Sequence, residues 1–169
     1  MTVATALGEW LANLLDPFPN WLIILFVSML PVLELRGSIP LGIGFLGMDW
    51  PTVLVLAIIG NLIVVPFIWW LLQPIEDLIR RWTWAGRQID RLYHRTRHRS
   101  RKRIETYEEL ALFLFVAIPL PGTGAWTGAL IAHLFDLPRF KSFWVIALGV
   151  LAAGIVVTAA TLTGIGLFT

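Results

Sequence analysis

Two charged residues in the middle of an apolar stretch constrain the fold of this chain more than any other feature. Trp21 to Leu33 and Ser38 to Met48 are short apolar arms on either side of Glu34-Leu35-Arg36-Gly37. A straight helix through both arms would be about 42 Å long, with an ion pair near its middle, whereas a bilayer core is about 30 Å thick and disfavours charge. We therefore expect a re-entrant hairpin that enters the membrane and returns to the same side.

The composition predicts an all-α integral membrane protein with a single membrane domain, residues 1–169. Hydrophobic residues make up 57% of the chain and charged residues only 14%, with a mean hydropathy of +0.78, while a soluble domain is about a quarter charged. Thr52 to Leu72 and Phe143 to Phe168 are long enough to span a bilayer. Met1 to Asp16 has no basic start, so we expect an amphipathic N-terminal helix rather than a cleaved signal peptide. The absence of cysteine excludes disulfides and thiolate metal sites.

A second pair of short arms follows later in the chain. Glu109 to Ile118 and Ala125 to Phe135 flank a break at residues 119–124, where proline and glycine favour a reversal. Matching residues of the two copies lie 87 to 89 positions apart: Phe26-Val27, Pro31, Asp49-x-Pro51 and Gly60 correspond to Phe115-Val116, Pro119, Asp136-x-Pro138 and Gly149. Chance similarity between apolar segments is the alternative. As a repeat, the copies cover about 19–73 and about 107–169, each a hairpin followed by a spanning helix.

The charge distribution predicts the orientation in the membrane. Ten of the thirteen lysines and arginines lie between Arg80 and Arg103, so the segment of about 74–106 is expected to be cytoplasmic. Within it, Glu76 to Tyr93 is expected to form a basic interfacial helix, on the inner leaflet or packed against the bundle, with membrane lipids rather than nucleic acid as its partner. One spanning helix then separates the copies. The repeat is therefore inverted, the chain crosses the cell membrane several times, and the C-terminus lies outside.

An inverted repeat with broken helices is the architecture of secondary transporters, whose substrates bind where the tips meet. Glu34 is expected to be the proton-coupling residue, because it alone of the two tip charges can lose a proton. Arg36 is expected to bind an anionic group of the substrate through its planar guanidinium. The alternative is a structural ion pair between Glu34 and Arg36 that stabilises the tip.

The second tip adds candidate substrate-binding residues. The backbone N–H groups of Gly122, Thr123 and Gly124 precede a helix and can form an anion-binding nest, or simply a turn. Trp126 is expected either to stack on an apolar substrate or to fill the contact between the tips. Residues expected to shape the tips are Pro31, Gly37, Pro40, Pro119, Pro121 and Gly128. No metal site or cofactor is expected.

Two motifs resemble a known family. Pro31-x-x-Glu34-x-Arg36-Gly37-x-x-Pro40 and Pro119-x-Pro121-Gly122-Thr123-Gly124-Ala125-Trp126-x-Gly128 are similar to those of the putative small multidrug export proteins, a distant branch of the DedA superfamily. The resemblance implies a re-entrant-hairpin transporter and, from the wider superfamily, proton-coupled handling of polyprenyl phosphates and lipid translocation. Glu34 matches the membrane-embedded acid of that superfamily. Its second-hairpin arginines are replaced here by Ala117, Gly122 and Thr123, so Arg36 would have to bind the phosphate.

These observations predict a transporter and not an enzyme: a proton-coupled secondary carrier or flippase for an anionic amphiphile, such as a polyprenyl phosphate, or for small amphiphilic drugs. A homodimer is expected, because two spans and two hairpins form a thin wall around a cavity. One alternative is an enzyme like the polyprenyl pyrophosphate phosphatases, although the second tip lacks the serine and arginine that phosphoryl transfer would need. The other is a lipid scramblase, which would not need a titrating Glu34.

Overall fold

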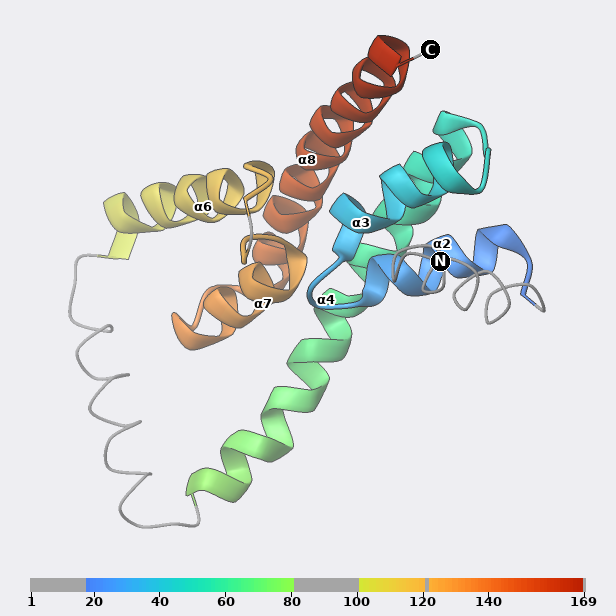
Figure 1. Cartoon of the computed structure of the whole chain (residues 1–169). Coiled ribbons are helices and arrows are strands. Elements are labelled where there is room, and N and C mark those ends of the chain that lie inside the picture. Colours follow the sequence, from blue (N-terminus) through green and yellow to red (C-terminus); the bar gives the residue numbers. More distant parts are fainter. Residues whose placement is uncertain (1–17, 81–100, 121, 169) are drawn as a thin grey trace.

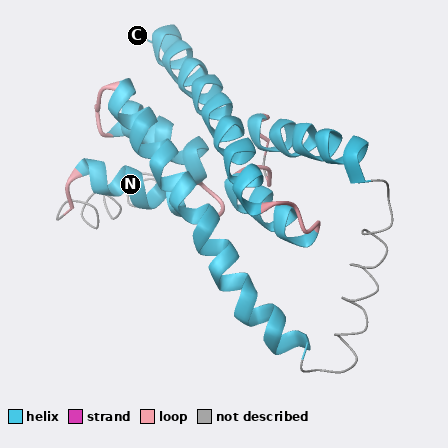
Figure 2. Cartoon of the chain, turned by 180° about the vertical axis from the view of Figure 1, so that it is seen from behind, coloured by secondary structure: helices cyan, strands magenta, loops and turns pink. Residues whose placement is uncertain are grey.

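The computed structural model of the chain describes residues 18–80, 101–120 and 122–168, and within these ranges it is all-helical (Figure 1). The elements in chain order are α2 (Asn20–Met29), α3 (Glu34–Pro40), the π-helix η1 (Leu41–Phe45), α4 (Trp50–Arg80), α6 (Arg101–Ala117), α7 (Ala125–Leu134) and α8 (Arg139–Phe168). Viewed from behind, the described part of the chain again consists of helices joined by short loops (Figure 2). This confirms the predicted all-α class.

Two helices are long and apolar enough to cross a membrane, Trp50–Pro74 within α4 and Arg139–Gly164 within α8. The predicted span Thr52 to Leu72 lies within the first, and α8 as a whole covers the predicted span Phe143 to Phe168. The two helices run antiparallel: Gly154, in the middle of α8, lies against Leu54 near the start of α4, and the side-chain oxygen of Gln73, late in α4, accepts from Arg139 at the start of α8. Large apolar side chains also remain exposed on the outer surface, for example Trp70 at 69% and Phe140 at 77%. Together, a buried apolar core and an exposed apolar exterior are typical of a protein surrounded by lipid.

The first break lies at Leu30–Leu33, four residues before the predicted position at Glu34–Gly37. The cause is Pro31, which cannot donate the next helical hydrogen bond and disfavours helical geometry at the preceding residue. Leu30 accordingly has an extended ψ of 134°. Glu34 and Gly37 therefore belong to the first turn of α3, where Glu34 has a φ of +47°.

The return arm of the first pair contains a second irregularity. Pro40 lies inside α3, and the helix continues as the π-helix η1. Since proline has no N–H for Arg36 to accept, the regular pattern is interrupted there, and Leu46 N–H donates to Leu41 O over five residues at 3.0 Å. The helix ends at Phe45, slightly before the predicted Met48. Pro40 is thus a residue of the return arm and not of the tip.

The second break agrees closely with the prediction. α6 ends at Ala117 and α7 begins at Ala125, and Gly122 and Gly124 have φ values of +83° and +138°. Both values favour glycine. Pro121 lies outside the described residues. We call α2, α3 and η1 the first helix pair, and α6 and α7 the second helix pair; in each, the chain turns back at the break (Figure 1).

The basic segment differs from the prediction in its described part. α4 continues through Pro74 to Arg80, so residues 76–80 extend the spanning helix and do not begin a separate interfacial helix. α6 begins at Arg101 and so includes the last residues of the basic run. The rest of that predicted helix, residues 81–93, and the predicted N-terminal helix lie outside the described residues.

The same close contact between two helices occurs within each half of the chain. A Cβ at Gly60 of α4 would lie 2.6 Å from Leu25 O and 2.8 Å from Ser28 Cβ of α2. A Cβ at Gly149 of α8 would lie 3.2 Å from Phe113 O and 2.7 Å from Val116 Cβ of α6. In each half, then, a glycine lets the long helix approach the first arm. The halves also cross over, because α3 contacts α8 and α7 contacts α4.

Candidate functional site

The two breaks meet at the start of α3 and the start of α7. Glu34 is 3% exposed, and its Oε1 accepts from the backbone N–H of Trp126 at 3.3 Å. The carboxylate lies directly against Gly124, where an added Cβ would overlap Glu34 Oε2 and lie 2.6 Å from Cδ. A side chain from the first helix pair is therefore held by the backbone of the second.

This contact makes Glu34 the cap of another helix. The N-cap residue of α7 is Gly124, which has no side chain to bind the free N–H groups of the first turn. The Glu34 carboxylate takes that role from across the interface, and the positive end of the α7 dipole stabilises it. The sequence predicts an anion-binding nest or a simple turn at Gly122 to Gly124; in the structure the side chain at this helix start is that of Glu34.

Arg36 also reaches the second helix pair. Its Nη2 donates to Thr123 Oγ1 at 2.7 Å, and its buried Nε has no hydrogen-bond partner in the described part of the chain. The Thr123 hydroxyl in turn lies 2.7 Å from Ile118 O and 2.8 Å from Leu120 O, and it accepts from Leu120 N–H. The guanidinium thus binds a hydroxyl that is fixed by its own turn.

Glu34 and Arg36 do not form a salt bridge; in the described residues, Lys141 and Glu109 do. Each tip charge is instead held by the opposite helix pair. The two charges lie close enough to attract each other, but their hydrogen bonds are made to the opposite helix pair.

Trp126 connects the tips through both of its N–H groups. The indole Nε1 donates to Met29 O at 2.9 Å, which is the last carbonyl of α2 and has no partner within its own helix. The partly buried ring packs against the apolar core. In the structure Trp126 lies in the contact between the tips.

The residues expected to shape the tips divide into two groups. Pro31 and Pro119 lie in the breaks, and Gly37 lies one turn into α3. Gly128, by contrast, lies inside α7, where an added Cβ would be 2.7 Å from Val116 Cγ2 of α6. Like Pro40, Gly128 therefore shapes the return arm and not the tip.

Sequence reasoning missed two buried polar contacts that support the site. The hydroxyls of Ser28 and Ser38 are hydrogen-bonded at 2.7 Å and join α2 to α3. Trp69 Nε1 of α4 donates to Ala129 O of α7 at 2.9 Å. A serine in each apolar arm was a usable signal, because a hydroxyl in an apolar environment needs a partner. Nothing in the sequence identified the partner of Trp69.

Comparison with known proteins gives one match. The family described as "Putative small multi-drug export protein" matches residues 34–156, well over half of the chain. No curated protein and no solved structure matches. The match begins at Glu34, directly after the first break, and includes the second break and α7. The chain is a membrane protein that belongs to the family of putative small multi-drug export proteins.

Proposed function

We propose that this protein is a proton-coupled carrier of anionic amphiphiles, with Glu34 as the proton site and Arg36 as part of the anion site. The observation that carries the proposal is the position of the Glu34 carboxylate at the N-terminus of α7. That helix start would otherwise be a binding site for an anion. A titratable group inside the site of a charged substrate provides a direct means of coupling.

Coupling follows from competition for one position. An ionised Glu34 occupies the α7 N-terminus and excludes another anion. A protonated Glu34 has no charge to interact with the helix dipole, so an anionic headgroup can take the N–H groups of α7. Arg36, whose Nε has no hydrogen-bond partner among the described residues and whose Nη2 donates to the Thr123 hydroxyl, would hold the same headgroup. Proton and anion would thus bind together.

We further propose that each helix pair is a re-entrant hairpin and that the halves form an inverted repeat, with the basic segment in the cytoplasm. The breaks at residues 30–33 and 118–124, the antiparallel α4 and α8, and the matching contacts of Gly60 and Gly149 all support this arrangement. In such a fold irregular backbone must be buried or line a cavity. The contact between the tips buries Glu34 and Gly124, whereas the exposed residues 30–33 would have to line a cavity.

The surroundings of the site favour an amphiphile over a small inorganic anion. Exposed apolar residues lie in both breaks, including Leu33 and Leu120, so a substrate with an apolar tail could enter from the membrane. A polyprenyl phosphate and an amphiphilic drug both have this character. Transport is favoured over phosphoryl transfer because the Thr123 hydroxyl is engaged by its own turn and by Arg36.

The test is uptake by proteoliposomes with an imposed pH gradient. Farnesyl phosphate and a cationic amphiphile are assayed in parallel, with wild-type protein, Glu34→Gln and Glu109→Gln. Glu109→Gln makes the same chemical change at a site 36% exposed. We expect wild type and Glu109→Gln to accumulate the anion in response to the gradient and Glu34→Gln to bind it without accumulation. Folded Glu34→Gln protein with unchanged pH-driven accumulation would overturn the proposal.

A further inference from the structure

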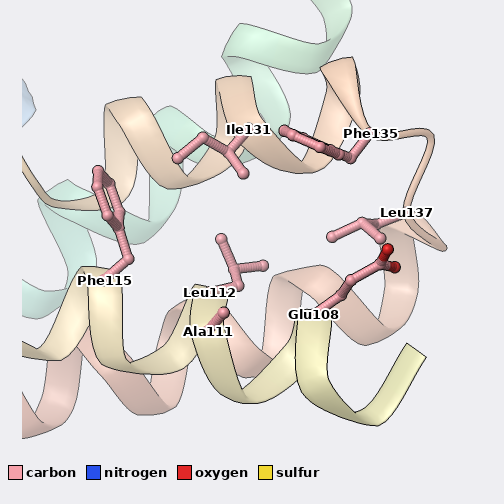
Figure 3. Close-up of a pocket in the computed structure, with 7 residues that line it drawn as sticks. All are labelled: Glu108, Ala111, Leu112, Phe115, Ile131, Phe135 and Leu137. Atoms are coloured by element: carbon pink, nitrogen blue, oxygen red, sulfur yellow. The ribbon is translucent and has the colours of Figure 1, made fainter. Parts of the chain in front are cut away.

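A hollow of about 220 Å³ lies between α6 and α7, separate from the contact between the tips (Figure 3). Its walls are apolar, and a single carboxylate, that of Glu108, stands at one end beneath Leu137. The apolar side chains that the argument uses are Leu112, Phe115, Ile131, Phe135 and Leu137. We call this hollow the α6–α7 groove.

The charges around the groove leave Glu108 as its one polar feature. Two basic residues at the start of α8 have other contacts: Lys141 lies 3.8 Å from Glu109, and Arg139 donates to Gln73. Within the described part of the chain, no salt bridge to Glu108 occurs. A carboxylate at the end of an apolar hollow is complementary to a cation that carries an apolar tail.

The surface next to the groove indicates where the occupant comes from. Phe135, which lines the groove, and its neighbour Leu134 are exposed by 50% and 47%, so the groove opens onto an apolar exterior. Glu108 lies toward the start of α6, whereas Phe115 lies toward the break. The groove can therefore take a chain that extends into the membrane with its headgroup at the α6 start.

From this geometry we propose that the α6–α7 groove is a second binding site, for a membrane-dissolved amphiphile with an ammonium headgroup. The ammonium binds Glu108, and the apolar tail lies between Leu112, Phe115 and Phe135. The site does not depend on the role of Glu34, because it shares no residue with the contact between the tips.

The test uses photolabelling of the full chain in lipid vesicles. One probe is a dodecylammonium with a diazirine at the end of its chain, and the other is the matching uncharged dodecanol. Modified residues are identified by mass spectrometry. We expect the ammonium probe to label residues of the groove, with Phe115 and Phe135 foremost, and to do so about fivefold more than the alcohol, the size of one modest charge interaction.

Three variants make the test specific. Glu108→Gln should reduce labelling by the ammonium to the level of the alcohol, while Glu109→Gln, its neighbour with the same change, should leave it unchanged. Ala111→Phe, which places a ring at the groove, should reduce labelling by both probes. Gel filtration and thermal unfolding of each variant establish that it is folded. Labelling of the Glu34→Gln variant by the ammonium probe should equal that of wild type. Equal labelling by both probes, or equal effects of Glu108→Gln and Glu109→Gln, would overturn the proposal.

Discussion

Gly124 is the residue on which the contact between the tips depends most. Its φ of +138° disfavours any other residue, and an added Cβ would overlap the Glu34 carboxylate. We expect Gly124→Ala to lower the free energy of unfolding by about 1–3 kcal/mol or more, the usual cost of a forced backbone conformation. Gly44→Ala is the control, because its Cβ would meet no atom within 4 Å. The measurement is the unfolding temperature of each variant in detergent. Equal unfolding temperatures for the two variants would show that the contact between Glu34 and Gly124 does not contribute to stability.

Arg36 tests the anion site at the same scale. Arg36→Lys keeps the charge but loses the planar group of several donors, one of which binds Thr123. We expect binding of farnesyl phosphate to weaken by about tenfold, the value of one hydrogen bond to a charged group. The pH dependence of binding should remain, because Glu34 is unchanged. Unaltered affinity in Arg36→Lys would remove Arg36 from the proposed anion site.

At the scale of elements, the start of α4 offers a test through Asp49. Its Oδ2 accepts from Thr52 N–H at 3.1 Å, and the hydrogen bonds to the Thr52 hydroxyl and N–H lower the pKa of Asp49. Because the pKa is lower in the folded state, the stabilisation is present above the ordinary pKa of about 3.9 and is lost as pH falls through the lowered value.

Two substitutions of Asp49 test this pH dependence. We expect Asp49→Ala to unfold at lower temperature than wild type at pH 7, and the difference to shrink below about pH 4. Asp49→Asn keeps an acceptor for the helix start and should lie close to wild type at pH 7. A constant difference between wild type and Asp49→Ala across this range would show that the ionised cap does not contribute.

The elements also show how far the sequence determines the fold. The length of an apolar stretch and the position of proline are local properties, so both spans and the second break could be predicted. The first break could not be placed correctly from Glu34 and Arg36, because charge marks a polar environment and Pro31 sets the end of the helix. The extension of α4 through Pro74 could not be predicted either, since proline ends many helices but not all.

In the candidate site, too, the residues could be predicted from the sequence but their contacts could not. Glu34, Arg36, Thr123 and Trp126 could be placed at the tips, because charge is unusual inside an apolar stretch and a run of proline and glycine marks a break. Their partners could not. That Glu34 caps α7, and that Trp126 binds the last carbonyl of α2, depends on how the two helix pairs pack together, which no local pattern records.

At the scale of the whole molecule, the proposed topology puts opposite ends of α4 on opposite sides of the membrane. The chain has no native cysteine, so single cysteines can be introduced directly. Phe45 at the end of η1 and Phe140 at the start of α8 are 83% and 77% exposed. We expect a membrane-impermeant maleimide to reach Phe45→Cys only from outside and Phe140→Cys only from the cytoplasm. Labelling of both from one side would contradict the inverted arrangement.

The most direct measurement of coupling counts the protons that the protein takes up for each anion it binds. Titration calorimetry with decane-1-sulfonate in buffers of different ionisation enthalpy gives this number, and the sulfonate itself does not titrate between pH 5 and 8. Because an ionised Glu34 must leave the α7 N-terminus before the anion can enter, we predict uptake that approaches one proton per anion in wild type where Glu34 is ionised, and none in Glu34→Gln. Binding to wild type without proton uptake at every pH, or equal uptake by Glu34→Gln, would contradict the competition between Glu34 and the substrate.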